Sequence, residues 1–326
     1  QTELFLVTGA IDAMVVDMQC IMPSLPAIAK CYKTRFITTV PFVRHPEAIH
    51  VDFRPEEADA RAQEIVRHAI AAYKERKAAG IHTRIPDVSS KLLTGISVES
   101  LVSVLSTVDA KDPLKPVIDA IAAGDILGAV GMVGCPNPKL RDGAMSEKMA
   151  EGLLRNNVLI VTTGCVNHIL AQGGFLTSEA TEKYAGPRLK KVLTAIGHAA
   201  GLGGPLPPVL HMGSCVDNSR IYDLLAALAG KLGVEISQLP VAGSAPEFIT
   251  EKAISIGSFF LAAGILVHLA PAPRVFGSPF AVSLLTEKLP GLNGGKVLVA
   301  ATPESAVSGI LAHLREKRQA LGLPQA

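Results

Sequence analysis

Aromatic residues, net charge and long apolar runs are all scarce in this sequence. Tryptophan is absent from the 326 residues and aromatics make up only 4% of them, so stacking platforms for bases or sugars are not expected. A formal net charge of +2 is too balanced for a typical nucleic-acid-binding surface. No apolar run approaches the roughly 18 residues of a membrane helix, and no signal peptide is visible. We therefore expect a cytoplasmic protein that binds no nucleic acid and spans no membrane.

The residues that are present indicate a folded α/β protein. Apolar residues make up 48% and charged residues 18% of the chain, which excludes a disordered chain, and the length predicts about two domains. Short apolar runs alternate with longer helical stretches, as in βαβ units that build a parallel sheet. The expected strands are 13–18, 35–39, 126–133, 158–162, 209–212, 239–242, 265–269 and 296–301, and the expected helices are 25–32, 56–78, 97–106, 114–123, 146–155, 187–200, 219–232, 246–263 and 303–320.

A polar, proline-containing segment over residues 79–91 is the best candidate for a domain boundary. We expect the end of a Rossmann-like domain over residues 1–86 and a complete Rossmann-like domain over residues 87–326, each with helices flanking a parallel sheet. The first piece is small, and the chain enters an apolar, strand-like run over residues 4–8 almost at once. Both features predict that the chain is the C-terminal part of a longer polypeptide.

Nucleotide-binding signatures are not found. The glycines at 128, 131 and 134 have the wrong spacing for a dinucleotide-binding loop, and Gly294-Gly295-Lys296 leads into an expected strand rather than a helix. A generic nucleotide-dependent oxidoreductase therefore has little support in the sequence.

Four of the five cysteines share one context. Cys20, Cys135, Cys165 and Cys215 each follow an apolar run expected to form a strand. The carboxyl ends of parallel strands meet at one edge of a sheet, where binding sites assemble. Singly, each thiol could be a small buried hydrophobe, but together they indicate metal or redox chemistry. Cys31 lies late in a helix and is expected to be a packed or surface thiol.

Thiolates bind Fe–S clusters, zinc or copper(I). The wide spacing of these four cysteines argues against a zinc ribbon, whose ligands come in close C-x-x-C pairs. The segments around them are VVDMQCIMPS at 15–24, GCPN at 134–137, TGC at 163–165 and MGSCVDNSR at 212–220, with SAPE at 244–247 and EKA at 251–253 further on.

In order and spacing, these segments resemble the anaerobic nickel–iron carbon monoxide dehydrogenases over nearly the whole chain. The 115 residues from Cys20 to Cys135 are most similar to the spacing in the acetogen enzymes that partner an acetyl-CoA synthase subunit. The resemblance implies reversible oxidation of CO with water to CO2 at a Ni–Fe–S cluster, the C-cluster.

The resemblance also implies a role for each site residue. Cys20, Cys135 and Cys165 would bind irons, Cys215 would bind the nickel, and Lys252 would be the catalytic lysine beside the substrate. From the sequence alone, Lys252 would be assigned to a helix surface.

Two further polar residues follow site cysteines. Asn218 and His168 are candidates to lie next to the cluster, although His168 is expected rather to cap a helix or pack in the core.

Further partners are implied by the resemblance. In the family, a His and a Cys upstream of the segment around Cys20 also bind the cluster, and cysteines for further [4Fe-4S] clusters lie upstream as well. The nineteen residues before Cys20 contain neither Cys nor His. We therefore expect an N-terminal remainder that carries these ligands, a homodimer, a ferredoxin-type electron acceptor and, in an acetogen-like complex, an acetyl-CoA synthase subunit.

Two alternatives stay open. A hybrid-cluster protein of the hydroxylamine reductase type would hold an Fe–S–O cluster, and a non-catalytic α/β assembly subunit would use the thiols as core residues. Nickel in the protein favours the dehydrogenase, iron without nickel favours the hybrid-cluster protein, and a stable, iron-free and colourless preparation favours the assembly subunit.

Overall fold

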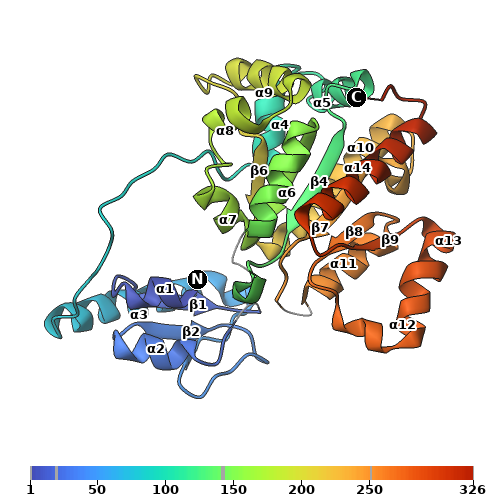
Figure 1. The fold of residues 1–326 in the computed structure, drawn as a ribbon. Helices are drawn as coiled ribbons and strands as arrows, with labels where there is room; N and C mark the ends of the chain where they lie inside the picture. The colour runs from blue at the N-terminus through green and yellow to red at the C-terminus, as the bar shows by residue number, and fades with distance from the viewer. Residues whose placement is uncertain (1, 19–20, 141–143, 250–251, 326) are drawn as a thin grey trace. The chain divides into compact units, whose positions relative to one another are not determined.

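The chain divides into two compact units, residues 1–90 and 91–326 (Figure 1). The computed structural model describes residues 2–18, 21–140, 144–249 and 252–325. The boundary expected at residue 86 lies four residues before this division. None of the described helices is both long enough and apolar enough to cross a membrane.

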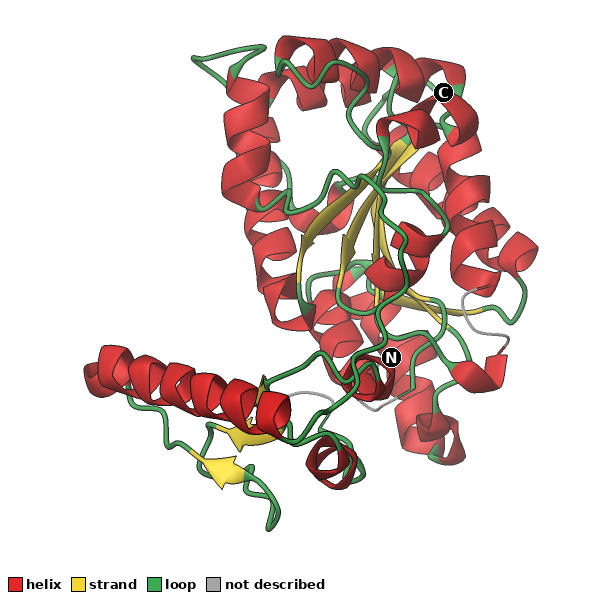
Figure 2. Cartoon of the chain, turned by 90° about the vertical axis from the view of Figure 1, so that its left-hand side faces the viewer, coloured by secondary structure: helices red, strands yellow, loops and turns green. Residues whose placement is uncertain are grey.

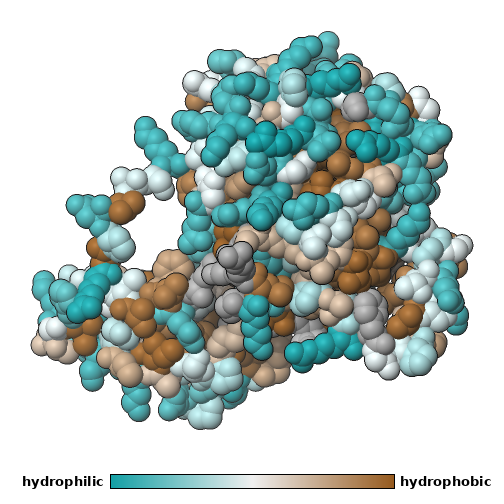
Figure 3. Space-filling view, viewed as in Figure 1, coloured by the Kyte–Doolittle hydropathy of each residue, from teal (hydrophilic) through white to brown (hydrophobic). Residues whose placement is uncertain are grey.

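Unit 1 is a small parallel sheet with three helices. Its strands pair in the order β1-β2-β3, and Leu6, Leu25, Ala29 and Phe36 form its buried cluster. Large apolar side chains remain at its surface, among the brown areas in the lower left of Figure 3. The elements are α1 (Thr2–Val7), β1 (Ala13–Val16), α2 (Leu25–Cys31), β2 (Arg35–Thr38), β3 (Ile49–His50) and α3 (Ala58–Ala78).

The strand-like run over residues 4–8 was wrongly interpreted, because α1 covers most of it. Leu6 is 1% exposed, whereas Leu4 and Phe5 are 67% and 51% exposed. The run therefore buries one side of a helical turn rather than both faces of a strand. Periodicity alone cannot separate these cases in so short an apolar run.

Unit 2 contains a six-stranded, fully parallel sheet in the order β6-β5-β4-β7-β8-β9. If the six strands of unit 2 are numbered 1 to 6 along the chain, this order is 3-2-1-4-5-6. That is the doubly wound order of Rossmann-like domains. The prediction of an α/β fold with helices flanking parallel sheets is confirmed. The strands are β4 (Gly128–Val133), β5 (Val158–Thr163), β6 (Val209–Gly213), β7 (Val241–Ala245), β8 (Leu266–Leu269) and β9 (Lys296–Val299).

Helices cover both faces of this sheet (Figure 2). The first and last long helices after β4, α6 and α14, pack against each other. The helices are α4 (Val98–Ser106), α5 (Lys115–Ala123), α6 (Ala144–Arg155), α7 (Val166–Gln172), α8 (Ser178–Tyr184), α9 (Pro187–Ala199), α10 (Asn218–Leu232), α11 (Lys252–Ala262), α12 (Pro279–Ser283), α13 (Leu289–Asn293) and α14 (Pro303–Ala320).

Two expected boundaries between β6 and β8 are wrong. β7 begins after Pro240 rather than at residue 239, because proline has no N–H to donate to a sheet ladder. α11 is described from Lys252 rather than from residue 246, since residues 246–249 form a turn and an irregular segment. The second shift follows the carboxyl end of β7, from which the chain leads to Lys252.

Arg318 of α14 is the largest fully buried side chain of the described residues. Its Nη1 donates to the carbonyl oxygens of Ile121, Ile126 and Leu127 at 2.8, 3.2 and 3.3 Å. Its Nε and Nη2 donate to the carbonyl oxygen of Pro324 at 2.9 and 2.7 Å. One guanidinium thus joins the C-terminal tail to the end of α5 and the start of β4.

We expect Arg318→Leu to lower the free energy of unfolding by about 3–5 kcal/mol, because buried carbonyls lose their donor. The apparent Tm should fall on the order of 10 °C, as followed by circular dichroism. Arg315→Ala, at an exposed position of the same helix, is the control and should change stability by less than about 0.5 kcal/mol. Equal Tm values for the two variants would contradict the prediction.

Candidate metal centre

The three cysteines that unit 2 contributes lie at one edge of its sheet. Cys135 follows β4, Cys165 follows β5 and Cys215 follows β6, each within two residues of the end of its strand. These strands are direct neighbours in the sheet. Three residues that are far apart in the sequence are therefore carried on three adjacent turns.

Backbone hydrogen bonds join these three turns. The amide of Val166, next to Cys165, donates to the carbonyl oxygen of Gly134 at 3.0 Å, and the amide of Gly164 donates to that of Gly213 at 3.0 Å. The three glycines have φ of +109°, +73° and +139° for Gly134, Gly164 and Gly213, a range that glycine adopts readily and other residues rarely do. The local sequence therefore fixes the three cysteines in one rigid frame.

Gly164 also leaves room for the Cys215 thiol. A Cβ at residue 164 would lie 2.3 Å from Cys215 Sγ and 3.6 Å from the carbonyl oxygen of Gly134. The thiol of one turn thus packs directly over the backbone of the next, where any side chain would exclude it.

Asn218 also fixes the Cys215 turn through its side-chain hydrogen bonds. Its side chain is 5% exposed, its Nδ2 donates to the carbonyl oxygen of Cys215 at 3.0 Å, and its Oδ1 accepts from Thr163 Oγ1 at 2.7 Å. Thr163 is the last residue of β5. Asn218 therefore ties the Cys215 turn to the end of the neighbouring strand.

The candidate residues differ in burial. Cys135 and Cys215 are buried, while Cys165 and Cys31 are exposed, so Cys31 is the surface thiol expected. His168 is exposed rather than packed in the core, and Lys252 is half-buried. Cys20 lies outside the described residues, so its expected position beside the other cysteines stays a prediction.

The sequence analysis missed His211, in the middle of β6. Its Nε2 is 3.0 Å from the carbonyl oxygen of Gly213 and its Nδ1 is 2.7 Å from Thr94 Oγ1. Burial lowers the pKa of His211, and the contact of its ring with Gly213 supports the turn before Cys215. The signal for it was a histidine inside an otherwise apolar strand.

The donor set of unit 2 consists of thiols on successive turns of the sheet edge. Adjacent strands lie about 4.8 Å apart, so thiols on successive turns can each bind a different metal. Thiolates are also the usual ligands of Fe–S clusters.

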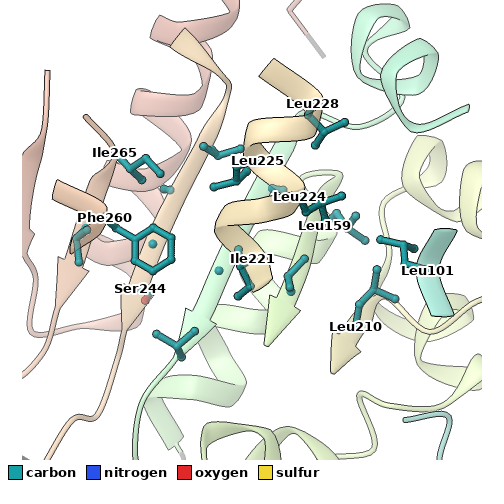
Figure 4. Close-up of a pocket in the computed structure, with 18 of the residues that line it drawn as sticks. Leu101, Leu159, Leu210, Ile221, Leu224, Leu225, Leu228, Ser244, Phe260 and Ile265 are labelled. Atoms are coloured by element: carbon teal, nitrogen blue, oxygen red, sulfur yellow. The ribbon is translucent and has the colours of Figure 1, made fainter. Parts of the chain in front are cut away.

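An apolar cavity of about 120 Å³ reaches these residues, and its lining includes Cys135, Cys215 and Lys252. It lies between the sheet and helices of one face. Figure 4 shows Ile221, Leu224, Leu225 and Leu228 along α10, with Leu101, Leu159, Leu210, Ser244, Phe260 and Ile265 around them. A small apolar molecule can be accommodated there with little competition from water.

Comparison with known proteins matches residues 1–304 to the Prismane/CO dehydrogenase family. The chain is 46% identical over 321 residues to carbon monoxide dehydrogenase 1 of Carboxydothermus hydrogenoformans, covering 98% of this chain and 50% of that protein. It is 40% identical over 322 residues to the carbon monoxide dehydrogenase/acetyl-CoA synthase subunit beta of Moorella thermoacetica, covering 98% and 48%.

The solved structure of carbon monoxide dehydrogenase IV from Carboxydothermus hydrogenoformans agrees with these matches. It superposes with a TM-score of 0.88 at 50% identity, covering 98% of this chain and 50% of that one. The chain spans about half the length of the curated relatives it matches. The family that the cysteine segments resembled is therefore confirmed, and the chain belongs to the Prismane/CO dehydrogenase family.

Proposed function

We propose that this chain forms part of an anaerobic carbon monoxide dehydrogenase that catalyses CO + H2O ⇌ CO2 + 2H⁺ + 2e⁻. The observation that carries this proposal is the set of three thiols on adjacent, hydrogen-bonded turns at the edge of a doubly wound sheet. Membership of the family and the apolar cavity beside the thiols support it.

In this proposal, Cys135 and Cys165 bind irons of a Ni–Fe–S cluster and Cys215 binds its nickel, with Cys20 as a further iron ligand. A bound cluster would supply the redox chemistry. In the same proposal, [4Fe-4S] clusters on an N-terminal remainder and a ferredoxin-type acceptor would serve as electron carriers.

The chain's own residues would supply orientation, charge and an apolar route for CO. Lys252 would donate a hydrogen bond to an oxygen of the substrate and stabilise the negative charge that develops there. The apolar cavity beside the thiols would admit CO. Burial of the Cys215 turn keeps bulk solvent from the thiol, which is 8% exposed.

The larger assembly belongs to the same proposal. We expect a cytoplasmic homodimer, with an acetyl-CoA synthase partner if the enzyme supplies CO for acetyl-CoA synthesis. The similarity to the beta subunit from Moorella thermoacetica supports such a partner, although the identity to carbon monoxide dehydrogenase 1 of Carboxydothermus hydrogenoformans is higher.

Metal analysis of the anaerobically purified protein tests the proposal. We expect nickel together with several irons for each chain, and reduction of methyl viologen that depends on CO. Iron without nickel would instead favour the hybrid-cluster protein, and a stable, colourless, metal-free preparation would favour the assembly subunit.

A further inference from the structure

Two chain connections meet at the centre of the sheet in unit 2. β4 and β7 are adjacent strands, paired from Ala129↔Val241 to Met132↔Ser244, and the strand order reverses between them. The connection from β4 to α6 carries Cys135, and the connection from β7 leads to Lys252 at the start of α11. In doubly wound folds this reversal is where ligands bind, so whatever fixes these connections to each other shapes the site.

The carboxylate of Glu247 joins the two connections. Glu247 follows β7 and is 0% exposed. Its Oε1 accepts from the backbone amides of Met145 and Ser146 at 3.0 and 3.1 Å and from Ser146 Oγ at 3.3 Å. Its Oε2 accepts from the amide of Asn137 at 3.4 Å. The donors therefore come from the first turn of α6 and from the segment that carries Cys135.

Asn137 provides a second link in the opposite direction. It is 9% exposed, and its Nδ2 donates to the carbonyl oxygen of Phe248 at 3.1 Å. The amide of Phe248 donates to the carbonyl oxygen of Ala270, just beyond β8, at 3.1 Å. The residue two positions after Cys135 is thus held by the residues four and five positions before Lys252.

A carboxylate is a costly choice for this position if packing is its sole role. Burying a charge costs several kcal/mol unless hydrogen bonds compensate, and an apolar side chain would avoid that cost. An apolar side chain would, however, leave the first amides of α6 and the Asn137 amide without this acceptor. A carboxylate at a helix N-terminus is also favoured by the helix dipole. A buried Glu247 can therefore accept hydrogen bonds from α6 and from Asn137 at the same time.

We propose that Glu247 is a positioning residue that fixes the Cys135 turn against the segment before Lys252, and so sets where the lysine lies relative to the metals. The inference rests on the proposed function, because its effect on turnover is exerted through Lys252. Glu247 itself touches neither metal nor substrate in this role.

Glu247→Gln tests the role with little change in shape. The amide oxygen can still accept from the α6 amides, but its NH2 group then faces the Asn137 amide, donor against donor. We expect kcat for CO oxidation to fall about 10- to 100-fold, as for other small misplacements of a catalytic group, with KM for CO within about twofold. Glu151→Gln, which changes the same charge at an exposed pair with Arg155 on α6, should leave kcat unchanged.

A double-mutant cycle with Lys252→Ala separates positioning from general support of the fold. If Glu247 acts through Lys252, Glu247→Gln should lower kcat by less than about twofold once the lysine is gone. Effects that multiply in the double variant, or an unchanged kcat in Glu247→Gln, would overturn the proposal.

A second variant covers the case in which Glu247→Gln does not fold. Asn137→Ala removes the bond to Phe248 and should show a smaller decrease in kcat that also vanishes in the Lys252→Ala background; a decrease that persists there would overturn the proposal. Hydrogen exchange of the amides of Asn137, Met145 and Ser146 reports on the link independently of activity, and unchanged exchange in Glu247→Gln would refute it. A wild-type protein without CO oxidation would refute the proposed function instead.

Discussion

Replacing Cys215 by alanine is expected to abolish both nickel retention and CO oxidation. The thiol lies over Gly164, and its turn is fixed by Asn218 and by the end of β5. Alanine keeps the Cβ and these backbone contacts, so the fold should persist while the soft ligand is lost. Nickel for each chain, measured by inductively coupled plasma mass spectrometry, and CO-dependent viologen reduction should both fall to background.

Cys31→Ala is the matched control for this variant. Its thiol is exposed and lies 3.5 Å from the carbonyl oxygen of Ala27, one turn earlier in α2. Its removal should change neither metal content nor activity. CO-dependent viologen reduction that survives in Cys215→Ala would refute the assignment of Cys215 as a metal ligand.

Lys252→Ala is expected to leave the cluster intact and to lower turnover about 10²- to 10³-fold, the usual cost of removing a donor that stabilises developing charge. Lys252 begins α11, and its side chain shares the lining of the apolar cavity with Cys135 and Cys215. An ammonium there acts in surroundings of low polarity, where charge stabilisation is stronger than in water. Metal content and kcat measured on the same preparation check the prediction.

Lys115→Ala is a suitable control, because Lys115 also begins a helix and makes an exposed ion pair with Asp119. Its kcat should match that of the wild type. Full turnover in Lys252→Ala would remove the lysine from the mechanism, and loss of nickel there would show that the lysine supports metal binding rather than the reaction.

The positions of Cys135, Cys165 and Cys215 could be predicted because their signal is local. An apolar run followed by a glycine and a cysteine marks the end of a strand, and parallel strands bring their ends to one edge whatever their order. The order itself, with β4 at the centre, could not be predicted, because each strand is apolar enough to take an inner place. Family resemblance was needed for Lys252, since a lysine in a helical stretch ordinarily lies at a surface.

Glu247 and Arg318 show where local patterns carry no information. Both belong to residue types that are mostly exposed, yet each is 0% exposed. Apart from the bonds of Arg318 to nearby Pro324, their partners lie about 100 to 200 residues away in the sequence, so no local window reveals these contacts. The sequence pattern predicted a helix from residue 246. The contacts of Glu247 with residues about 100 positions earlier lie outside that pattern.

The linked cysteine turns also bear on the stage of folding at which the proposed cluster could be inserted. Cys135, Cys165 and Cys215 are 30 and 50 residues apart in the sequence, and the bonds among their turns form only when β4, β5 and β6 have paired. Parallel pairing closes long loops and is slow, so the ligands assemble late in folding. An unfolded chain offers scattered thiols, whereas the finished sheet edge offers a preformed site. If the proposed cluster binds at these thiols, we expect its insertion to follow folding and its binding energy to stabilise this edge against local opening.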